Sequence, residues 1–269
     1  MPEGTGGIAG PANGGPRTTP QLLDGALRLY LSRFAPMLSL SLVGTVVGWL
    51  LLLTGHAMAL PTNAAFPQLL RPFSRQETFT PALWAAILGA LVQVLIWTAL
   101  ITVAGRAATA PDAAPPSLTA SIRAGLPRVW PVLITGLALT LGGGLGLVLL
   151  IIPGVFLLTR WSVAPVAAVL EQRGAASALG RSFSLVRGLF WHTLGTYVLG
   201  LLAAIVFSLV LGSAGSLLAA VTGPAASAIG TFWSAATTAA VNPFMVCLLV
   251  LLYFDLRARN EDQDPEGAL

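Results

Sequence analysis

Long apolar runs separated by short arginine-bearing segments dominate the chain. Residues 34–70 and 78–105 each contain no Asp, Glu, Lys or Arg. Residues 129–170 contain one such residue, Arg160, and residues 188–254 contain none. A helix needs about 20 residues to cross a hydrocarbon core of about 30 Å. The first two runs therefore each predict one transmembrane helix, and the other two are long enough for more than one.

Turn-forming residues divide the two longer runs. A continuous helix over residues 129–170 would be about 63 Å long, roughly twice the thickness of the core. Pro153 and Gly154 interrupt it and predict a tight hairpin. The last run has a Gly- and Ser-rich centre that carries Pro224. The pattern thus predicts six transmembrane helices, at about residues 35–57, 81–105, 129–151, 155–171, 189–213 and 228–254.

A weak internal repeat groups these helices into three hairpins. Each copy begins with a pair of arginines, followed in the first two copies by a proline: Arg28, Arg33 and Pro36; Arg123, Arg128 and Pro131; Arg181 and Arg187. Each pair lies in a short segment that leads into a hairpin. The sequence therefore predicts an all-α, six-helix polytopic membrane bundle, in which each of three hairpins follows a short interfacial amphipathic helix.

The short segments have helical amphipathic spacing. In residues 174–189, small and apolar residues recur on one face, and Arg181 lies on the other with two serines. Such a helix can lie in the inner interface with its arginines toward anionic headgroups. It can equally be a cytoplasmic linker helix packed on the bundle. The pattern leaves both interpretations open, and the paired arginines form a candidate cytoplasmic interface.

Flanking segments and arginine placement predict the domains and the topology. We expect a disordered cytoplasmic tail at 1–20, a transmembrane domain at 21–259 and a short acidic cytoplasmic tail at 260–269. With both termini inside, most arginines fall on the inner side, and only Arg71 and Arg75 fall outside. This is the positive-inside bias of a multi-pass protein of the cell (inner) membrane.

A few polar residues lie within or at the ends of the predicted spans. Arg160, Gln93 and Asn242 form a candidate intramembrane polar site, because polar groups in a span are costly. For Arg160 the alternatives are snorkelling to the outer headgroups or structural pairing, against ligand or lipid-phosphate binding. Gln93 and Asn242 suit interhelical hydrogen bonds. Interfacial ion pairs are expected between Glu171 and Arg173 and between Asp255 and Arg257.

Composition excludes several classes of protein. Only 9% of the 269 residues are charged, against about 25% in soluble domains. The net charge is +4. Arginines beside apolar spans are typical of topology signals and not of a nucleic-acid-binding surface. The single cysteine, Cys247, cannot form an internal disulfide. No catalytic constellation is recognisable, so we expect no enzyme activity, metal or cofactor.

Two segments, residues 151–195 and 251–259, resemble the membrane domain named after glycerophosphoryl diester phosphodiesterase, which occurs as standalone actinobacterial proteins. The residues that carry the resemblance are Pro153, Gly154, Arg160, Trp161, Glu171, Ala178, Leu179, Ser182, Leu185, Val186, Arg187, Gly188, Tyr253, Asp255, Leu256 and Arg257. The resemblance implies a six-helix membrane protein. In the name-giving members a separate soluble barrel carries catalysis, and we expect this chain to lack it.

Two functions are compatible with these observations. The first is a non-catalytic membrane scaffold that contacts anionic lipid headgroups at the cytoplasmic face, or a membrane protein partner. The alternative is a transporter or permease subunit for a lipid or small apolar solute, which predicts a polar cavity reaching Arg160, Gln93 or Asn242.

Overall fold

The computed structural model describes residues 17–59, 76–220 and 226–263. All regular secondary structure in these three ranges is helical, which confirms the all-α fold. Six helical stretches are long and apolar enough to cross a membrane. Their apolar side chains are largely exposed: only 17% to 50% of each most apolar window is buried inside the protein. An exterior of this kind is stable when lipid covers it, so the chain is a multi-pass membrane protein.

The helices follow one another in three units, each a short helix and then a hairpin. The first unit contains α1 (Thr19–Ser32), α2 (Phe34–Ala59) and α3 (Gln76–Thr109). The second contains α4 (Leu118–Gly125), α5 (Val129–Ala138), α6 (Gly144–Leu149), α7 (Ile151–Trp161) and α8 (Ala164–Leu170). The third contains α9 (Ala175–Leu185), α10 (Phe190–Ala220) and α11 (Ala226–Gln263). A 3-10 turn, Leu126–Arg128, precedes α5, and a π-helical turn, Leu139–Gly143, joins α5 to α6.

The repeated arginines mark equivalent places in these units. Arg33, Arg128 and Arg187 each lie at the junction between the short helix and the hairpin. Arg33 donates from Nη2 to the carbonyls of Pro111 and Ala113, in the linker that follows its hairpin. Arg128 donates from Nη1 to the carbonyl of Gln172, in the linker that follows the second hairpin. The first two copies of the repeat therefore share a contact as well as a spacing.

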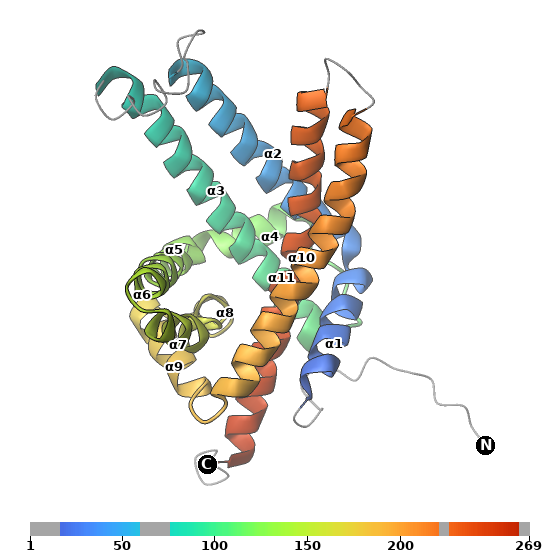
Figure 1. Cartoon of the computed structure of the whole chain (residues 1–269). Helices are drawn as coiled ribbons and strands as arrows, with labels where there is room; N and C mark the ends of the chain where they lie inside the picture. The colour runs from blue at the N-terminus through green and yellow to red at the C-terminus, as the bar shows by residue number, and fades with distance from the viewer. Residues whose placement is uncertain (1–16, 60–75, 221–225, 264–269) are drawn as a thin grey trace, which may run out of the picture.

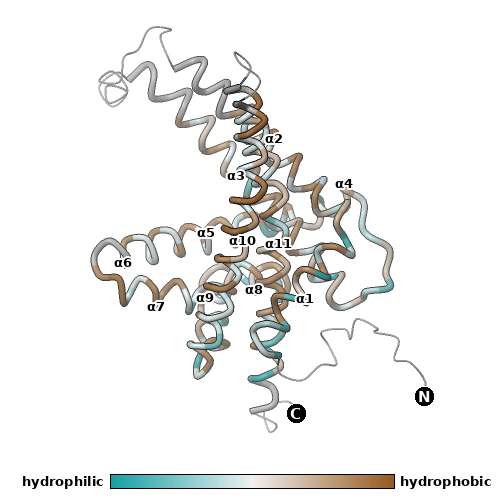
Figure 2. The backbone as a smooth tube through the Cα atoms, turned by 45° about the vertical axis from the view of Figure 1, so that its right-hand side comes forward, coloured by the Kyte–Doolittle hydropathy of each residue, from teal (hydrophilic) through white to brown (hydrophobic). Residues whose placement is uncertain are grey.

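The three hairpins differ in direction. Figures 1 and 2 show α2 with α3 and α10 with α11 as two lengthwise pairs, which spread apart at the upper end. The hairpin of α5 to α7 is seen end-on in Figure 1 and runs sideways in Figure 2. It therefore lies crosswise to α10 and α11, a relationship that hydropathy alone does not encode.

Several predicted boundaries differ from the structure. The second hairpin turns at Leu150, which has an extended backbone, and Pro153 lies within the first turn of α7. Proline is tolerated there because the first amide groups of a helix have no intrahelical partner. The helix predicted at 155–171 is divided at Ser162 and Val163 into α7 and α8.

The predicted tails also change. α1 begins at Thr19, inside the predicted N-terminal tail, and α11 extends to Gln263, into the predicted acidic tail. The rest of these tails, and the segment with Arg71 and Arg75 that is predicted to lie outside, are not among the described residues. Pro243 lies inside the continuous helix α11.

The buried core lies where α1, α3, α8 and the second half of α11 meet. Leu22 and Ala26 of α1 are fully buried, as are Val166 of α8 and Leu252 of α11. The face on which small and apolar residues of 174–189 recur is turned into the protein, since Ala178, Ser182 and Leu185 are buried. The short helices thus pack on the bundle. α1 also exposes the apolar Leu27 and Leu31 beside Arg28, which an interfacial position would require.

Candidate anion-binding site at the arginine-bearing end

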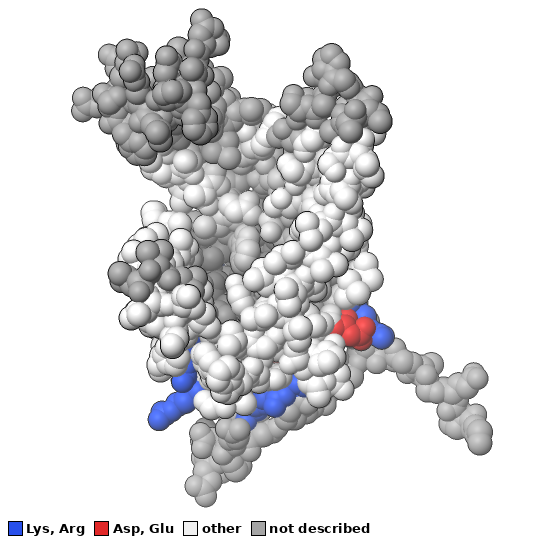
Figure 3. Space-filling model, viewed as in Figure 1, with Lys and Arg blue, Asp and Glu red and all other residues white. Residues whose placement is uncertain are grey.

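Charged side chains gather at one end of the molecule. On the face seen in Figure 3, those of the described residues lie in the lower half, below an uncharged upper part. The start of α1 and the end of α11 meet there, because Arg17 donates its backbone N–H to the Asp255 carboxylate over 2.6 Å. The two ends of the described chain therefore lie on the same side of the bundle.

Glu171 is the centre of the first ionic cluster at this end. Its Oε1 accepts hydrogen bonds from the Tyr253 hydroxyl at 2.6 Å and from Arg181 Nε at 2.9 Å. Its Oε2 accepts one from Arg173 Nε. The predicted pair of Glu171 and Arg173 is present, and Arg181 completes it from α9. The cluster links the end of α8 to both α9 and α11.

The surroundings of Glu171 favour its charged form. Burial alone would raise the pKa of this carboxyl group. The hydrogen bonds from Tyr253, Arg181 and Arg173 outweigh burial and hold the pKa below its ordinary value of 4.5. Glu171 therefore suits a permanent anchor for cations better than an exchangeable proton carrier.

Asp255 is the centre of a second cluster, and its partners differ from the prediction. The side chain is buried, and its Oδ2 lies 2.9 Å from both His192 Nε2 and Arg259 Nε. The expected pair with Arg257 is not among its contacts. Arg259 lies one helical turn further on and also donates from Nη2 to the Arg17 carbonyl at 2.5 Å. His192 joins α10 to this cluster.

Helical geometry explains how one short stretch of α11 serves both clusters. Successive residues of a helix are rotated by about 100°, so residues two apart point to nearly opposite sides. Tyr253 points to Glu171, and Asp255 points to His192 and the start of α1. Arg257 follows on the side of Tyr253, where it lines a pocket.

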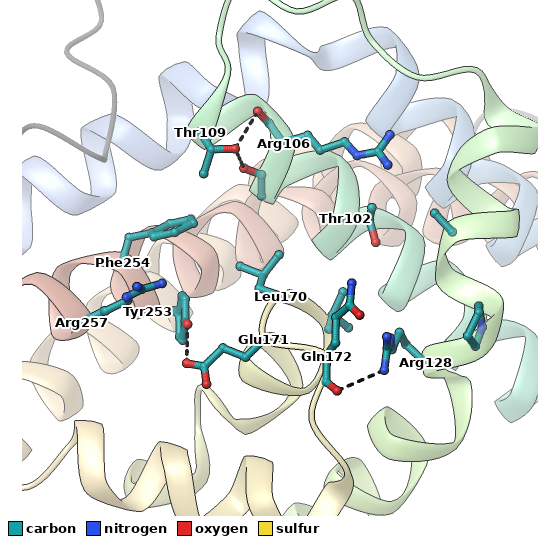
Figure 4. A pocket seen from close by; sticks show the side chains of 14 residues that line it. Thr102, Arg106, Thr109, Arg128, Leu170, Glu171, Gln172, Tyr253, Phe254 and Arg257 are labelled. Carbon is teal, nitrogen blue, oxygen red and sulfur yellow. Dashed lines mark hydrogen bonds between the residues drawn. The ribbon is translucent and has the colours of Figure 1, made fainter. Parts of the chain in front are cut away.

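The pocket has a volume of about 620 Å³ and opens between α3, the junction before α5, the end of α8 and α11. Its lining residues are Thr102, Gly105, Arg106, Thr109, Ala124, Pro127, Arg128, Val169, Leu170, Glu171, Gln172, Tyr253, Phe254 and Arg257. Figure 4 shows Arg106, Arg128 and Arg257 on three separate sides of it. Three cations and one carboxylate therefore surround a space in the size range of small-molecule sites.

The backbone beside the pocket is strained at Gln172. Its φ is +56°, in the left-handed region that residues other than glycine, asparagine and aspartate rarely adopt. The Gln172 carbonyl accepts the hydrogen bond from Arg128 at 3.3 Å. The turn at Gln172 connects α8 to α9, and it places Glu171 and Gln172 on the wall of the pocket. Strained backbone residues are often found at functional sites.

Arg160 lies away from this pocket and contacts α9. Its Nη1 donates to the Phe183 carbonyl at 3.1 Å, and its own carbonyl accepts from Ser182 Oγ at 2.8 Å. The guanidinium carbon lies 5.1 Å from the ring centroid of Phe156 and 4.6 Å from that of Phe183. Arg160 is thus paired structurally with the arginine-bearing helix α9. Structural pairing is one of the alternatives that the sequence leaves open for Arg160.

The predicted intramembrane polar site is not assembled. Arg160 reaches Phe156 and Phe183, whereas Gln93 lies on α3 and Asn242 on α11. None of the three lines the pocket of about 620 Å³. Within the described ranges, neither Gln93 nor Asn242 makes the side-chain hydrogen bond expected from the sequence.

The six arginines of the candidate interface have different surroundings. Arg28 pairs with Asp24 at 2.8 Å, and Arg181 pairs with Glu171. Arg33 and Arg128 donate to backbone carbonyls in linkers. The side chains of Arg123 and Arg187 are exposed and have no ionic partner within the described part of the chain. Arg33 and Arg128 also have no carboxylate partner among the described residues, but only Arg123 and Arg187 lack a side-chain hydrogen bond there as well.

Sequence reasoning missed Arg106 and the role of His192. Arg106 is a single arginine at the end of α3 with no partner in the repeat, and only packing brings it to the pocket.

A comparison of the chain with protein-family models, curated proteins and solved structures finds no match.

Proposed function

We propose that this is a non-catalytic multi-pass protein of the cell membrane that contacts anionic lipid headgroups through its arginine-bearing end. Both termini would be cytoplasmic. The contact between Arg17 and Asp255 supports a common side for the two ends, and the excess of arginine on that side supports the cytoplasm.

The observation that carries the proposal is the uncompensated charge at the junctions and short helices. Arg123 and Arg187 are exposed, and within the described ranges no carboxylate pairs with them. Basic residues near a membrane surface attract anionic lipids with about 1 kcal/mol each. The buried Asp255 and the partly buried Glu171 at this end are held by arginines and join helices, which is a structural role.

Selective lipid contact can be measured with spin-labelled lipids. The full chain would be reconstituted in phosphatidylcholine and probed with labelled phosphatidylglycerol or labelled phosphatidylcholine. We expect a preference for phosphatidylglycerol that decreases as salt screens the charges. The double variant Arg123→Gln, Arg187→Gln should lose part of this preference.

Arg28→Gln is the matched control, because the charge of Arg28 is already balanced by Asp24. It should keep the preference of the wild type. If the double variant kept it too, the proposal for these arginines would be wrong.

We also propose membership of the glycerophosphoryl diester phosphodiesterase membrane-domain group. Residues that carry the resemblance contact one another: the Tyr253 hydroxyl donates a hydrogen bond to Glu171, and the Ser182 hydroxyl donates one to the carbonyl of Arg160. An alignment with members of that group in which Glu171 and Tyr253 are retained or lost together would support the assignment, and independent variation of the two would count against it.

A further inference from the structure

We propose that the pocket between α3, α8 and α11 binds a phosphate-ester anion, namely the headgroup of an anionic glycerophospholipid. This inference rests on the proposed function and narrows it to one site. It concerns Arg106 and Arg128, whereas the proposed function concerns Arg123 and Arg187.

The charge balance of the pocket favours an anion. Arg106 and Arg128 line it, and Glu171 is the only acidic residue among the described residues of its lining. Both oxygens of Glu171 are already occupied by Arg173 and Arg181, which do not line the pocket. Arg173 and Arg181 therefore already balance the charge of Glu171, so that it does not balance the charges of Arg106 and Arg128.

The arginines also have donors to offer. A guanidinium group carries five N–H donors in a planar fork that matches phosphate oxygens. Arg128 uses Nη1 for the Gln172 carbonyl at 3.3 Å, which leaves its other donors. The Arg106 side chain is exposed and makes no hydrogen bond or ion pair with the described residues. Arg106 comes from the first helical unit and Arg128 from the second, and Figure 4 shows them on different sides of the pocket.

The apolar part of the wall favours a lipid over a free phosphate. Val169, Leu170 and Phe254 line the same pocket as the arginines. All three lie in or at the end of helices long and apolar enough to span the membrane. A headgroup bound by the arginines would place its glycerol and first methylene groups against these side chains. Basic pockets between transmembrane helices are a recurring form of lipid headgroup site.

Thermal unfolding of the purified full chain in neutral detergent tests the site. The probes are dioctanoyl phosphatidylglycerol, dioctanoyl phosphatidylcholine with the same chains, and inorganic phosphate. A ligand that binds the folded state raises the midpoint in a saturable way. We expect saturation with phosphatidylglycerol, and an affinity about tenfold lower in each of Arg106→Gln and Arg128→Gln.

Two controls separate binding from folding. Arg106→Lys keeps the charge and should recover much of the affinity, although it lacks the planar fork. Arg28→Gln lies outside the pocket and should bind as the wild type does. The midpoint without ligand and the circular dichroism of each variant report whether it is folded.

The outcomes are distinct. Wild-type affinity in the double variant Arg106→Gln, Arg128→Gln would overturn the site, and so would equal protection by phosphatidylcholine. Protection by inorganic phosphate with the same arginine dependence would support the phosphate site but overturn the lipid as its source. Arg123→Gln and Arg187→Gln test the proposed function separately, because neither residue lines the pocket.

Discussion

The Tyr253 hydroxyl donates a 2.6 Å hydrogen bond to the carboxylate of Glu171, which joins the last hairpin to the end of the second. Tyr253 is 1% exposed, and the Glu171 side chain is 14% exposed. A hydrogen bond to a charged acceptor in such surroundings is among the stronger ones in a protein. The contact fixes the wall of the pocket and carries the first prediction.

Tyr253→Phe removes this hydroxyl and keeps the ring. We expect the free energy of unfolding to fall by about 1.5–3 kcal/mol, because Glu171 loses one of its donors. Unfolding in detergent, followed by heat or by SDS titration, measures it. Tyr197→Phe is the matched control, since the Tyr197 hydroxyl makes no hydrogen bond with the described residues, and it should change stability little. Equal losses in both variants would contradict the assigned role of the contact.

The pH dependence of stability follows from Glu171. Its pKa is lower in the folded protein than the ordinary 4.5, so its contribution is present above the unfolded pKa. The contribution is lost as pH falls through the folded pKa. Between pH ~6 and ~3.5, the stability difference between the wild type and Glu171→Gln should therefore shrink. Denaturation of both proteins across this range measures the difference, and a gap that stays constant or widens toward acid would have the wrong sign.

Asp255 holds the start of α1 on the bundle. Asp255→Asn leaves Arg259 without its carboxylate partner and weakens the contact with the Arg17 N–H. Breaking a buried ion pair costs about 3–5 kcal/mol. We expect trypsin to cut after Arg17 faster than in the wild type. Asp24→Asn removes only the exposed pair with Arg28 and should leave the rate unchanged. A wild-type cleavage rate in Asp255→Asn would show that α1 is held by its apolar face alone.

The sequence predicts the spans and the junctions well because both depend on local patterns. A charge-free run of sufficient length requires a lipid-covered helix whatever its neighbours are. The arginines at Arg33, Arg128 and Arg187 recur at the same place in each unit because each marks the end of an amphipathic segment. Properties of this kind can be read along a chain without knowing what packs against it.

The pairing of charges could not be predicted in the same way. Arg257 is nearer to Asp255 in the sequence than Arg259 is, yet helical rotation places Arg259 beside the carboxylate. His192 and Arg106 come to their clusters through packing between units. The hydrogen bond of Arg160 with the Phe183 carbonyl depends on where α9 lies against α7. The crosswise direction of the second hairpin is likewise a tertiary property.

Close backbone approach within that hairpin gives a further prediction. A Cβ atom on Gly146 would lie 2.7 Å from Gly154 Cα, where backbone cannot yield as a flexible side chain does. Gly146→Ala should therefore destabilise the protein by about 1–3 kcal/mol. Gly136→Ala on the same hairpin meets nothing within 4 Å. It should be neutral or stabilise by up to about 1 kcal/mol through helix propensity. The midpoints of unfolding should move in opposite directions or differ clearly, and two equal shifts would contradict the packing.

The side of the membrane on which the tip of the second hairpin is accessible shows whether this hairpin crosses the membrane or is re-entrant. Ile152 is 84% exposed at this tip, and the native Cys247 is fully buried, so a cysteine at 152 can be labelled on a low background. With six crossings and inner termini, Ile152→Cys should react with a membrane-impermeant maleimide added outside intact cells. Ala176→Cys, on the exposed side of α9, should react only after the membrane is opened. If Ile152→Cys also required opening, the hairpin would enter and leave on the inner side, in keeping with its crosswise direction, and the chain would cross the membrane four times.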